Sequence, residues 1–279
     1  MRFCGLCCCL IVRITCFSQP ETEFIGTAFN KPYFKSYLYD TRDIIVSPAK
    51  ASPRQLLQFS AVTCAGIVIA SQDARIRNFA LDNRSLTTQR IQEHFLEPWG
   101  SGKYSMPLLG MFYFYGSVKN DERSKQTALL GLKAFVISGI IVTIPKQFFH
   151  RHRPCPTAYG GSSHPACATE SPFEFDGLFN IKGDFQSFND YVNIFFQSSN
   201  NSFPSGHSAS AFAMATVISE QFKYKKWVPI IAYSLAGLTS LSRIEANKHW
   251  ASDVFIGAAL GYSVGKFITR KKNWKVKTF

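Results

Sequence analysis

A histidine and an aspartate near the C-terminal end have the types and spacing needed for nucleophilic chemistry. His249 and Asp253 are four residues apart in the stretch SRIEANKHWASD, just before the apolar run 254–268. On a helix, side chains at this spacing lie on one face. A carboxylate there can hold one ring nitrogen and leave the other free to attack. Arg243 lies upstream and is expected to bind an anion, although the pair alone also fits a helix cap or a solvated contact.

A second candidate is His207 in the stretch PSGHS, which opens the apolar run 209–222. Ser205 is expected to cap this helix, and Gly206 allows the backbone to approach a ligand closely. Free N–H groups at a helix start attract phosphate. The stretch therefore predicts an anion site with an imidazole at its mouth. The alternative is an ordinary capped helix with an exposed histidine.

The third candidate is a pair of cations, Lys146 and Arg153, which are seven residues apart. Two helical turns would place them on one side of a helix that Pro154 then ends. Two cations on one face suit a multiply charged oxyanion. The alternative is an ordinary basic helix end, whose cations interact with the helix dipole and with solvent. His150 and His152 lie between the two cations and are interpreted as local charge.

Together the three segments read K-x6-R-P, P-S-G-H and S-R-x5-H-x3-D in that order, with every position filled. This pattern resembles the type 2 phosphatidic acid phosphatase (PAP2) superfamily, which also contains vanadium haloperoxidases and bacterial class A acid phosphatases. The resemblance covers residues 146–253. It implies an all-α helical bundle of about six core helices, with the three motifs brought together at one end.

The resemblance also implies a role for each matched residue. His249 would attack phosphorus to form a phosphohistidine, and Asp253 would orient it. His207 would protonate the leaving oxygen and then activate water. The other matched residues would bind the phosphate: Lys146, Arg153, Ser205, Gly206 and Arg243. This mechanism needs no metal, and no metal ligand set or other cofactor motif is apparent in the sequence.

The composition narrows the possible partners. The 279 residues suffice for one domain with a full core, 46% of them are apolar, and the net charge is +13. Such a charge favours nucleic acid, an anionic membrane surface or a phosphorylated substrate. Because no nucleic-acid signature is present, we expect a phosphorylated lipid substrate and a membrane rather than a nucleic acid. The sequence does not give an oligomeric state.

The chain divides into segments of different character. The first 18 residues resemble a signal segment, with Arg2, an apolar run and a small-residue cleavage site at 16–18, although Arg13 interrupts the run. The following lead-in is turn-rich and is expected to be loosely structured, with one short amphipathic piece. Apolar runs then predict helices at 56–70, 88–96, 106–118, 127–145, 209–222, 227–241 and 254–268, with a turn at 98–102. The predicted organisation is 1–18 signal-like, 19–54 lead-in, 55–270 helical phosphatase domain with a long active-site loop at 155–203, and 271–279 basic tail.

Three cysteines remain outside the signal-like segment. Cys155 and Cys167 bracket a loop directly after the first motif, and in an oxidising compartment they could form a disulfide that fixes this loop. Two free thiols in a flexible loop fit the sequence equally well. Cys64 lies in an apolar run and is expected in the core.

The sequence leaves membrane insertion open. Most apolar runs are shorter than the roughly 20 residues that a span needs. Two basic segments, the Lys-rich turn after Phe222 and the tail, would lie at the end of the bundle opposite the motifs. The positive-inside rule places this basic end in the cytoplasm, so the active site would face the periplasm of a bacterial envelope. Five equal spans after a cleaved signal would instead put the tail outside. A soluble periplasmic protein is the alternative.

Three functions follow, in order of preference. The first is a phosphatase acting on a lipid phosphate: phosphatidate, phosphatidylglycerol phosphate, undecaprenyl pyrophosphate or the phosphate of lipid A. Its motivation is the combination of apolar helices with an aromatic-rich loop near the expected pocket. The second is a soluble periplasmic acid phosphatase of broad specificity, suggested by the signal-like start and a mean hydropathy of −0.03. The third is a vanadium haloperoxidase, for which the chain is short.

Overall fold

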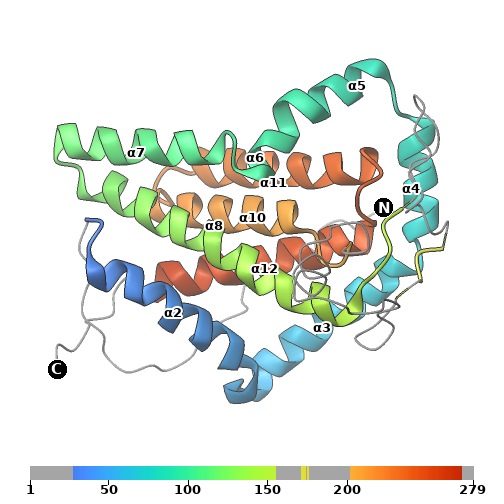
Figure 1. Cartoon of the computed structure of the whole chain (residues 1–279), viewed down its shortest axis with the longest axis horizontal. Helices are drawn as coiled ribbons and strands as arrows, with labels where there is room; N and C mark the ends of the chain where they lie inside the picture. The colour runs from blue at the N-terminus through green and yellow to red at the C-terminus, as the bar shows by residue number, and fades with distance from the viewer. Residues whose placement is uncertain (1–27, 155–170, 174, 176–201, 272–279) are drawn as a thin grey trace, which may run out of the picture.

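The computed structural model describes residues 28–154, 171–173, 175 and 202–271. These residues are helical apart from turns and an isolated β-bridge between Arg151 and Phe175. In chain order the helices are α2 (Lys31–Val46), η2 (Ser47–Lys50), α3 (Pro53–Ala70), α4 (Asp73–Asp82), α5 (Leu86–Ile91), the π-helix η3 (Gln92–Leu96), α6 (Glu97–Ser101), α7 (Ser105–Lys119), α8 (Glu122–Phe149), α10 (Gly206–Gln221), α11 (Trp227–Glu245) and α12 (Ala251–Lys271). The predicted all-α bundle is confirmed (Figure 1).

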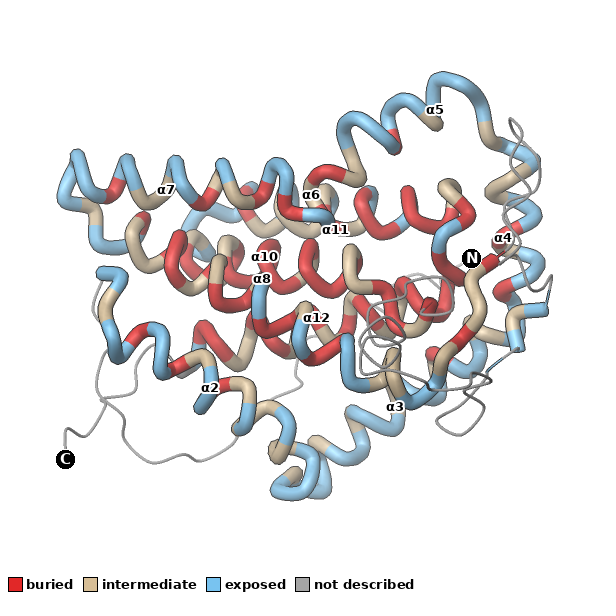
Figure 2. Tube along the Cα trace, viewed as in Figure 1, coloured by how far each residue is buried: buried red, intermediate tan, exposed pale blue. Residues whose placement is uncertain are grey.

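Helix α10 forms the centre of the bundle and is mostly buried (Figure 2). It packs against α8, α11 and α12. Gly257 and Gly261 of α12 face its backbone, and a Cβ added at Gly261 would lie 2.0 Å from the carbonyl oxygen of Ala209. Asp253 belongs to the same i, i+4 stripe of α12 as these glycines. The close packing of the two helices therefore holds Asp253 beside the start of α10.

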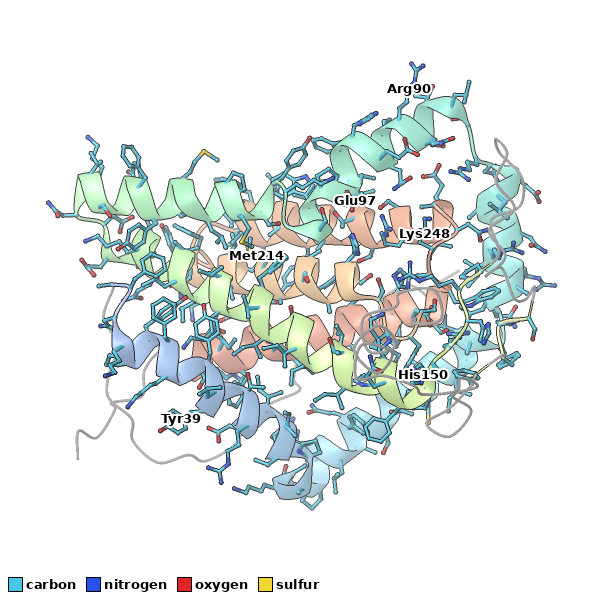
Figure 3. All side chains as sticks on the ribbon, viewed as in Figure 1. Tyr39, Arg90, Glu97, His150, Met214 and Lys248 are labelled. Atoms are coloured by element: carbon cyan, nitrogen blue, oxygen red, sulfur yellow. The ribbon has the colours of Figure 1, made fainter. Side chains whose placement is uncertain are left out.

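Helix α2 corrects the expectation of a loosely structured lead-in, because it is a regular 16-residue helix packed on α8. Its inner face combines aromatic and apolar side chains with two buried polar residues, Ser36 and Asp40. Asp40 forms a buried ion pair at 3.0 Å with Lys133, the residue that interrupts the longest apolar run. A buried ammonium group requires such a partner. Figure 3 shows Tyr39 pointing outward from α2, whereas Met214 lies in the middle of the bundle.

The segment expected as a turn at 98–102 is helix α6, so that prediction is wrong. Pro98 lies in the first turn of this helix, which continues directly from the π-helix η3. Gly102 ends the helix with a φ of +97°, a conformation that favours glycine. Helix α6 packs against α7, α10 and α11 and brings Glu97 to the start of α10.

The other predicted helices are present, with shifted ends. Helix α8 differs most in length, because it extends beyond both ends of the apolar run 127–145 and is nine residues longer. The prediction that Cys64 lies in the core is wrong, because its side chain is exposed on α3. The outer face of that helix is apolar over much of its length, which a sequence pattern alone does not distinguish from a buried helix.

Candidate active site

The three motif segments meet at one end of the bundle. Lys146 lies in the last turn of α8, His207 in the first turn of α10, and Arg243 in the last turn of α11. His249 and Asp253 belong to the connection between α11 and α12 and to the start of α12. Five residues that are up to about a hundred positions apart thus share one neighbourhood.

The first motif departs from the predicted helix. Helix α8 ends at Phe149, and His150 takes a left-handed conformation with a φ of +41°. Lys146 therefore lies on the helix and Arg153 in the segment after it, rather than both on one helical face. Pro154 does not end the helix, because the helix has already ended five residues earlier.

The second motif begins α10 as the sequence predicts. Ser205 is the N-cap, and its side chain accepts a hydrogen bond from the N–H of Ser208 at 3.4 Å. The N–H of Ser205 donates to the backbone carbonyl of Asp253 at 3.0 Å. Gly206 is the first residue of the helix, and the cap ties it to α12. The second and third motifs are therefore joined through their backbones.

His249 and Asp253 do not share a helical face, which corrects the prediction. Helix α11 ends at Glu245, Asn247 takes a left-handed conformation with a φ of +55°, and α12 begins only at Ala251. The Nδ1 atom of His249 is 2.8 Å from the carbonyl oxygen of Ser202 and 3.8 Å from Asp253 Oδ2. The carbonyl is therefore the hydrogen-bond partner of the ring, and Asp253 acts as a nearby charge.

The environment of His249 favours its neutral form. The side chain is 3% exposed, and burial lowers the pKa of His249 to about 3. Asp253 opposes this shift, whereas the charges of Arg153 and Lys146 add to it. Because a carbonyl only accepts, the neutral ring must carry its proton on Nδ1, which leaves the lone pair on Nε2.

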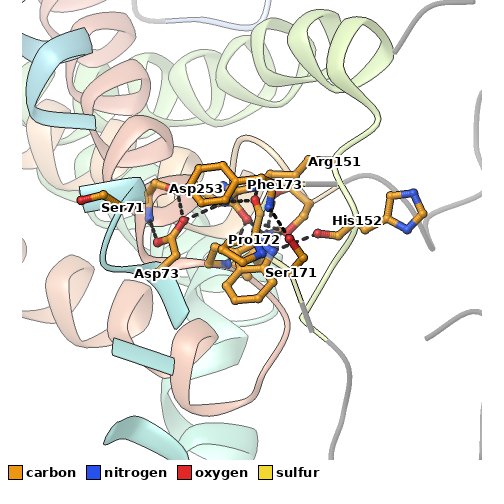
Figure 4. Close-up of polar contacts among 12 residues, drawn as sticks. Ser71, Asp73, Arg151, His152, Ser171, Pro172, Phe173 and Asp253 are labelled. Atoms are coloured by element: carbon orange, nitrogen blue, oxygen red, sulfur yellow. Dashed lines mark hydrogen bonds and ion pairs between the residues drawn. The ribbon is translucent and has the colours of Figure 1, made fainter. Parts of the chain in front are cut away.

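Asp253 is held in a buried network that the motifs do not include (Figure 4). Arg151 forms ion pairs with Asp253 and, at 2.7 Å, with Asp73 of α4. Ser252 donates its N–H to Asp73 at 2.9 Å. Ser202 donates its hydroxyl to Asp253 at 2.5 Å. Arg151 and the two carboxylates are each at most 2% exposed, so the network is sealed from solvent.

His207 has a different environment from His249. Its side chain is 27% exposed, and its Nε2 lies 3.1 Å from Oε1 of Glu97. Burial of the ring and the Arg243 guanidinium lower the pKa of His207 to about 4, and Glu97 acts in the opposite direction. Arg153 lowers the pKa of both imidazoles, so this guanidinium lies within electrostatic reach of each ring.

The arrangement suits the binding of a phosphate group between two imidazoles. The cations of the first and third motifs supply positive charge, and the N-terminus of α10 lies at the same end of the bundle. Among the described residues no group of three or more His, Cys, Asp or Glu side chains could hold a metal ion. Four neighbouring residues were missed by the sequence analysis: Asp73, Glu97, Arg151 and Ser202.

Several predictions fall on residues outside the described ranges. They are the signal-like segment 1–18, the pairing of Cys155 with Cys167, most of the loop 155–203, and the tail after residue 271. Of the loop, Pro172 accepts hydrogen bonds from Arg151 at 3.0 and 2.7 Å. This contact brings one point of the loop to the buried network.

Comparison with known proteins places these observations in a family context. The chain matches the model of the PAP2 superfamily over residues 127–277. It is 48% identical over 67 residues to a lipid A 1-phosphatase of Porphyromonas gingivalis, a match covering 24% of this chain and 15% of that protein. It is 26% identical over 177 residues to a probable diacylglycerol pyrophosphate phosphatase 1 of Schizosaccharomyces pombe, covering 58% of this chain and 59% of that protein. The matches thus span less than two thirds of either relative.

The fold also resembles a solved structure, that of a transmembrane PAP2-type phosphatidylglycerolphosphate phosphatase from Bacillus subtilis. The TM-score is 0.50 at 20% sequence identity, and the match covers 76% of this chain and 94% of that chain. This likeness concerns the arrangement of the helices.

Proposed function

This chain belongs to the PAP2 superfamily, and we propose that it is a phosphatase that hydrolyses lipid phosphate esters or pyrophosphates through a phosphohistidine. One observation carries the proposal: a buried neutral imidazole and a second imidazole lie at one end of the bundle within reach of the same guanidinium, Arg153. The names of both curated relatives refer to phosphatases of lipid substrates, which supports the same class here.

In the proposed first step, His249 Nε2 attacks phosphorus while the bond to the leaving oxygen breaks. The hydrogen bond from Nδ1 to the carbonyl of Ser202 keeps the lone pair on Nε2, and Asp253 stabilises the charge that develops on the ring. His207 donates a proton to the leaving oxygen. In the second step His207 takes a proton from the attacking water as the bond between phosphorus and His249 breaks.

The cations hold the nonbridging oxygens during both steps. Lys146, Arg153 and Arg243 neutralise the phosphate, and the hydroxyl of Ser205 with the N–H of Gly206 completes the cradle. A bound phosphate dianion would offset Arg153 and Arg243 and thereby raise the pKa of His207. Substrate binding would therefore favour the protonated ring that the first step needs. The chemistry requires no metal ion.

A membrane location is supported by the outer surface of the bundle. Among the described residues, α8 alone is long and apolar enough to cross a membrane, and α3 with α4 would qualify as a second span bent by 56°. Large apolar side chains are more than half exposed on several outer helices, among them Leu57, Ile67, Phe114, Ile230 and Leu241. A surface of this kind favours contact with lipid over solution in water.

The distribution of cations suggests an orientation. Helix α10 begins at the site and ends at Gln221, so the lysines at 223, 225 and 226 lie at the opposite end. Arg123 at the start of α8 stacks over Tyr224 at the same end, at 4.5 Å from the ring centroid. By the positive-inside rule, this end faces the cytoplasm, and the active site faces the outer side, which is the periplasm in a bacterial envelope.

Phosphate release from a substrate panel tests the proposal. Detergent-solubilised protein is incubated with phosphatidate, phosphatidylglycerol phosphate, undecaprenyl pyrophosphate, a lipid A phosphate and water-soluble phosphomonoesters, with chelator present. We expect turnover of at least one lipid, unaffected by chelator, and its loss in His249→Ala but not in the control His94→Ala, whose side chain is exposed. Unchanged turnover in His249→Ala, or release from no substrate at all, would contradict it.

Fractionation tests the location separately. Membranes washed with high salt should retain a lipid-embedded protein and should release a peripheral or soluble one. If the protein appears in the soluble fraction and prefers water-soluble esters, the function is that of a periplasmic acid phosphatase, and the lipid assignment is wrong.

A further inference from the structure

Helix α6 contacts His207 with two of its residues, although it lies outside all three motifs and outside the segment that matches the family. Glu97 Oε1 is 3.1 Å from Nε2 of the ring. A Cβ added at Gly100 would lie 2.8 Å from the Cδ2 and Cβ atoms of His207. The Nε2–Cδ2 edge of the imidazole is therefore turned toward α6. The opposite edge, which carries Nδ1, is turned away from this helix.

The position of Glu97 is fixed by its surroundings. Glu97 is the first residue of α6, and its side chain is 23% exposed. The backbone of α6 is bound to α7 by a hydrogen bond of 2.6 Å from Ser105 Oγ to the carbonyl of Trp99. Figure 3 labels Glu97 at this position on α6. A partly desolvated carboxylate on a packed helix loses little freedom when it accepts a hydrogen bond.

The charges that face His207 come from three elements: Glu97 on α6, Arg243 on α11, and Arg153 after α8. The two guanidinium groups oppose protonation of the ring, and the carboxylate favours it. Burial raises the pKa of Glu97, but His207 and then Arg243 and Lys103 lower it and so favour the charged carboxylate. Without the carboxylate, the cations that bind phosphate would disfavour the protonated ring needed for general acid catalysis.

We propose that Glu97 is the positioning residue of the general acid: it accepts the Nε2–H of His207 and so assigns proton transfer to Nδ1. This inference rests on the proposed phosphatase function and refines it. When phosphorus bonds to His249, the Nδ1 proton of His207 moves to the leaving oxygen. In the second step, Nδ1 takes a proton from the water whose oxygen bonds to phosphorus, and His249 leaves with its electron pair. Each proton lost by His207 is thus regained.

The variant Glu97→Gln tests the assignment, because it keeps the size and an acceptor oxygen but removes the charge. Its matched control is Glu93→Gln, one turn earlier, where the side chain is exposed. We expect kcat/KM for a long-chain alkyl phosphate, a poor leaving group, to fall by about 10-fold or more in Glu97→Gln. For 4-nitrophenyl phosphate, whose leaving group needs no proton, the fall should be clearly smaller.

The pH profile gives a second readout that a merely structural role would not move. Removal of the carboxylate lowers the pKa of His207, so the alkaline limb of kcat/KM should shift to lower pH in Glu97→Gln and stay in place in Glu93→Gln. An equal loss for both esters together with an unmoved limb would overturn the proposal. So would wild-type behaviour of Glu97→Gln.

A titration of the ring separates this proposal from the function on which it rests. ¹⁵N-histidine NMR, with the His207 signal assigned by its loss in His207→Gln, reports the protonated nitrogen and its pKa without turnover. Wild-type protein should carry the neutral proton on Nε2, and Glu97→Gln should titrate at lower pH. If phosphate release fails but the titration behaves as stated, the phosphatase function is wrong and the contact holds. If release succeeds and the titration is unchanged, Glu97 does not position His207.

Discussion

His249 and His207 stand at the same end of the bundle, but the chain holds them by opposite means. His249 is almost fully buried, bonds to a backbone carbonyl and lies beside a sealed network of one arginine and two carboxylates. His207 is more than a quarter exposed and is held by the carboxylate of Glu97, on a packed but partly exposed helix. The buried arrangement fixes a ring in its neutral form, whereas the exposed one permits protons to enter and leave.

The difference matches two chemical tasks. A nucleophile must keep one lone pair aimed at phosphorus, so rigidity and burial serve it. A general acid and base must exchange protons with solvent in every cycle, so partial exposure and an adjustable pKa serve it. The following substitutions and conditions should separate these two arrangements, from the largest effect to the smallest.

Removal of Arg151 should have the largest effect. Arg151→Gln leaves Asp73 and Asp253 buried without their cation, and we expect a loss of about 3–5 kcal/mol in the free energy of unfolding. Activity should fall as well, since Asp253 would move. Arg75→Gln, on the exposed side of α4, is the control and should be nearly neutral. Chemical unfolding in detergent measures both.

A double variant sharpens this prediction. Arg151→Gln with Asp73→Asn removes one of the two orphaned charges, so its destabilisation should be smaller than the sum of the two single changes. Simple additivity would show that the network does not act as a unit, and the rigid environment assigned to His249 would then lose its basis.

His207→Gln should act on the reaction and spare the fold. We expect kcat/KM for an alkyl phosphate to fall by about 10²–10⁴-fold, as for loss of a general acid. The unfolding midpoint should change little, because the ring belongs to no sealed network. A destabilisation as large as that of Arg151→Gln would mean that both histidines are held structurally, and the contrast between them would disappear.

Of the two histidines, His249 should contribute more than His207 to the pH dependence of the free energy of unfolding. Its pKa in the folded protein is about 3, below the ordinary value of 6.5, so the unfolded chain binds the proton first as pH falls. The stabilising contribution is thus complete above pH 6.5 and is lost progressively as pH falls toward 3. In His249→Gln the unfolding midpoint should be less sensitive to pH in this window. An equally steep acid loss in the variant would argue against the buried neutral ring.

Ser202→Ala should have the smallest effect. The backbone carbonyl that holds His249 remains, and Asp253 keeps its bonds to Arg151 and to the N–H of Trp250. The cost should be about 1 kcal/mol in stability, the net worth of one hydrogen bond. Turnover should stay within about fivefold of wild type. If turnover instead fell as far as in His207→Gln, the hydroxyl rather than the carbonyl would be the group that orients the ring.

The sequence predicted which residues form the site better than it predicted how they are arranged. The resemblance of the three motifs to the PAP2 superfamily grouped His207, His249 and the three cations, and the fold brings their segments to one end. The shared helical face of His249 and Asp253 failed because Asn247 takes a left-handed conformation and α12 begins two residues after His249. A spacing of four is compatible with either arrangement, so no periodicity could have decided between them.

The residues that support the site differ in how easily they could have been identified from the sequence. Arg151 stands inside the first motif, two residues before Arg153, and a third cation there could have been flagged. Asp73 and Glu97 lie far from every motif, and only the packing of α4 and α6 against the bundle end reveals their partners. Burial of Lys133 against Asp40 was hidden for the same reason.

Trapping of the phosphorylated enzyme tests the central claim most directly. Protein is mixed with 4-nitrophenyl phosphate, quenched in alkali, where phosphohistidine survives, and digested for mass spectrometry. We predict one phosphate on the peptide that contains His249, with more of it in His207→Gln because its hydrolysis lacks a general base. Phosphate on His207 instead, or product formation by His207→Gln with no phosphorylated peptide at any time, would contradict the account.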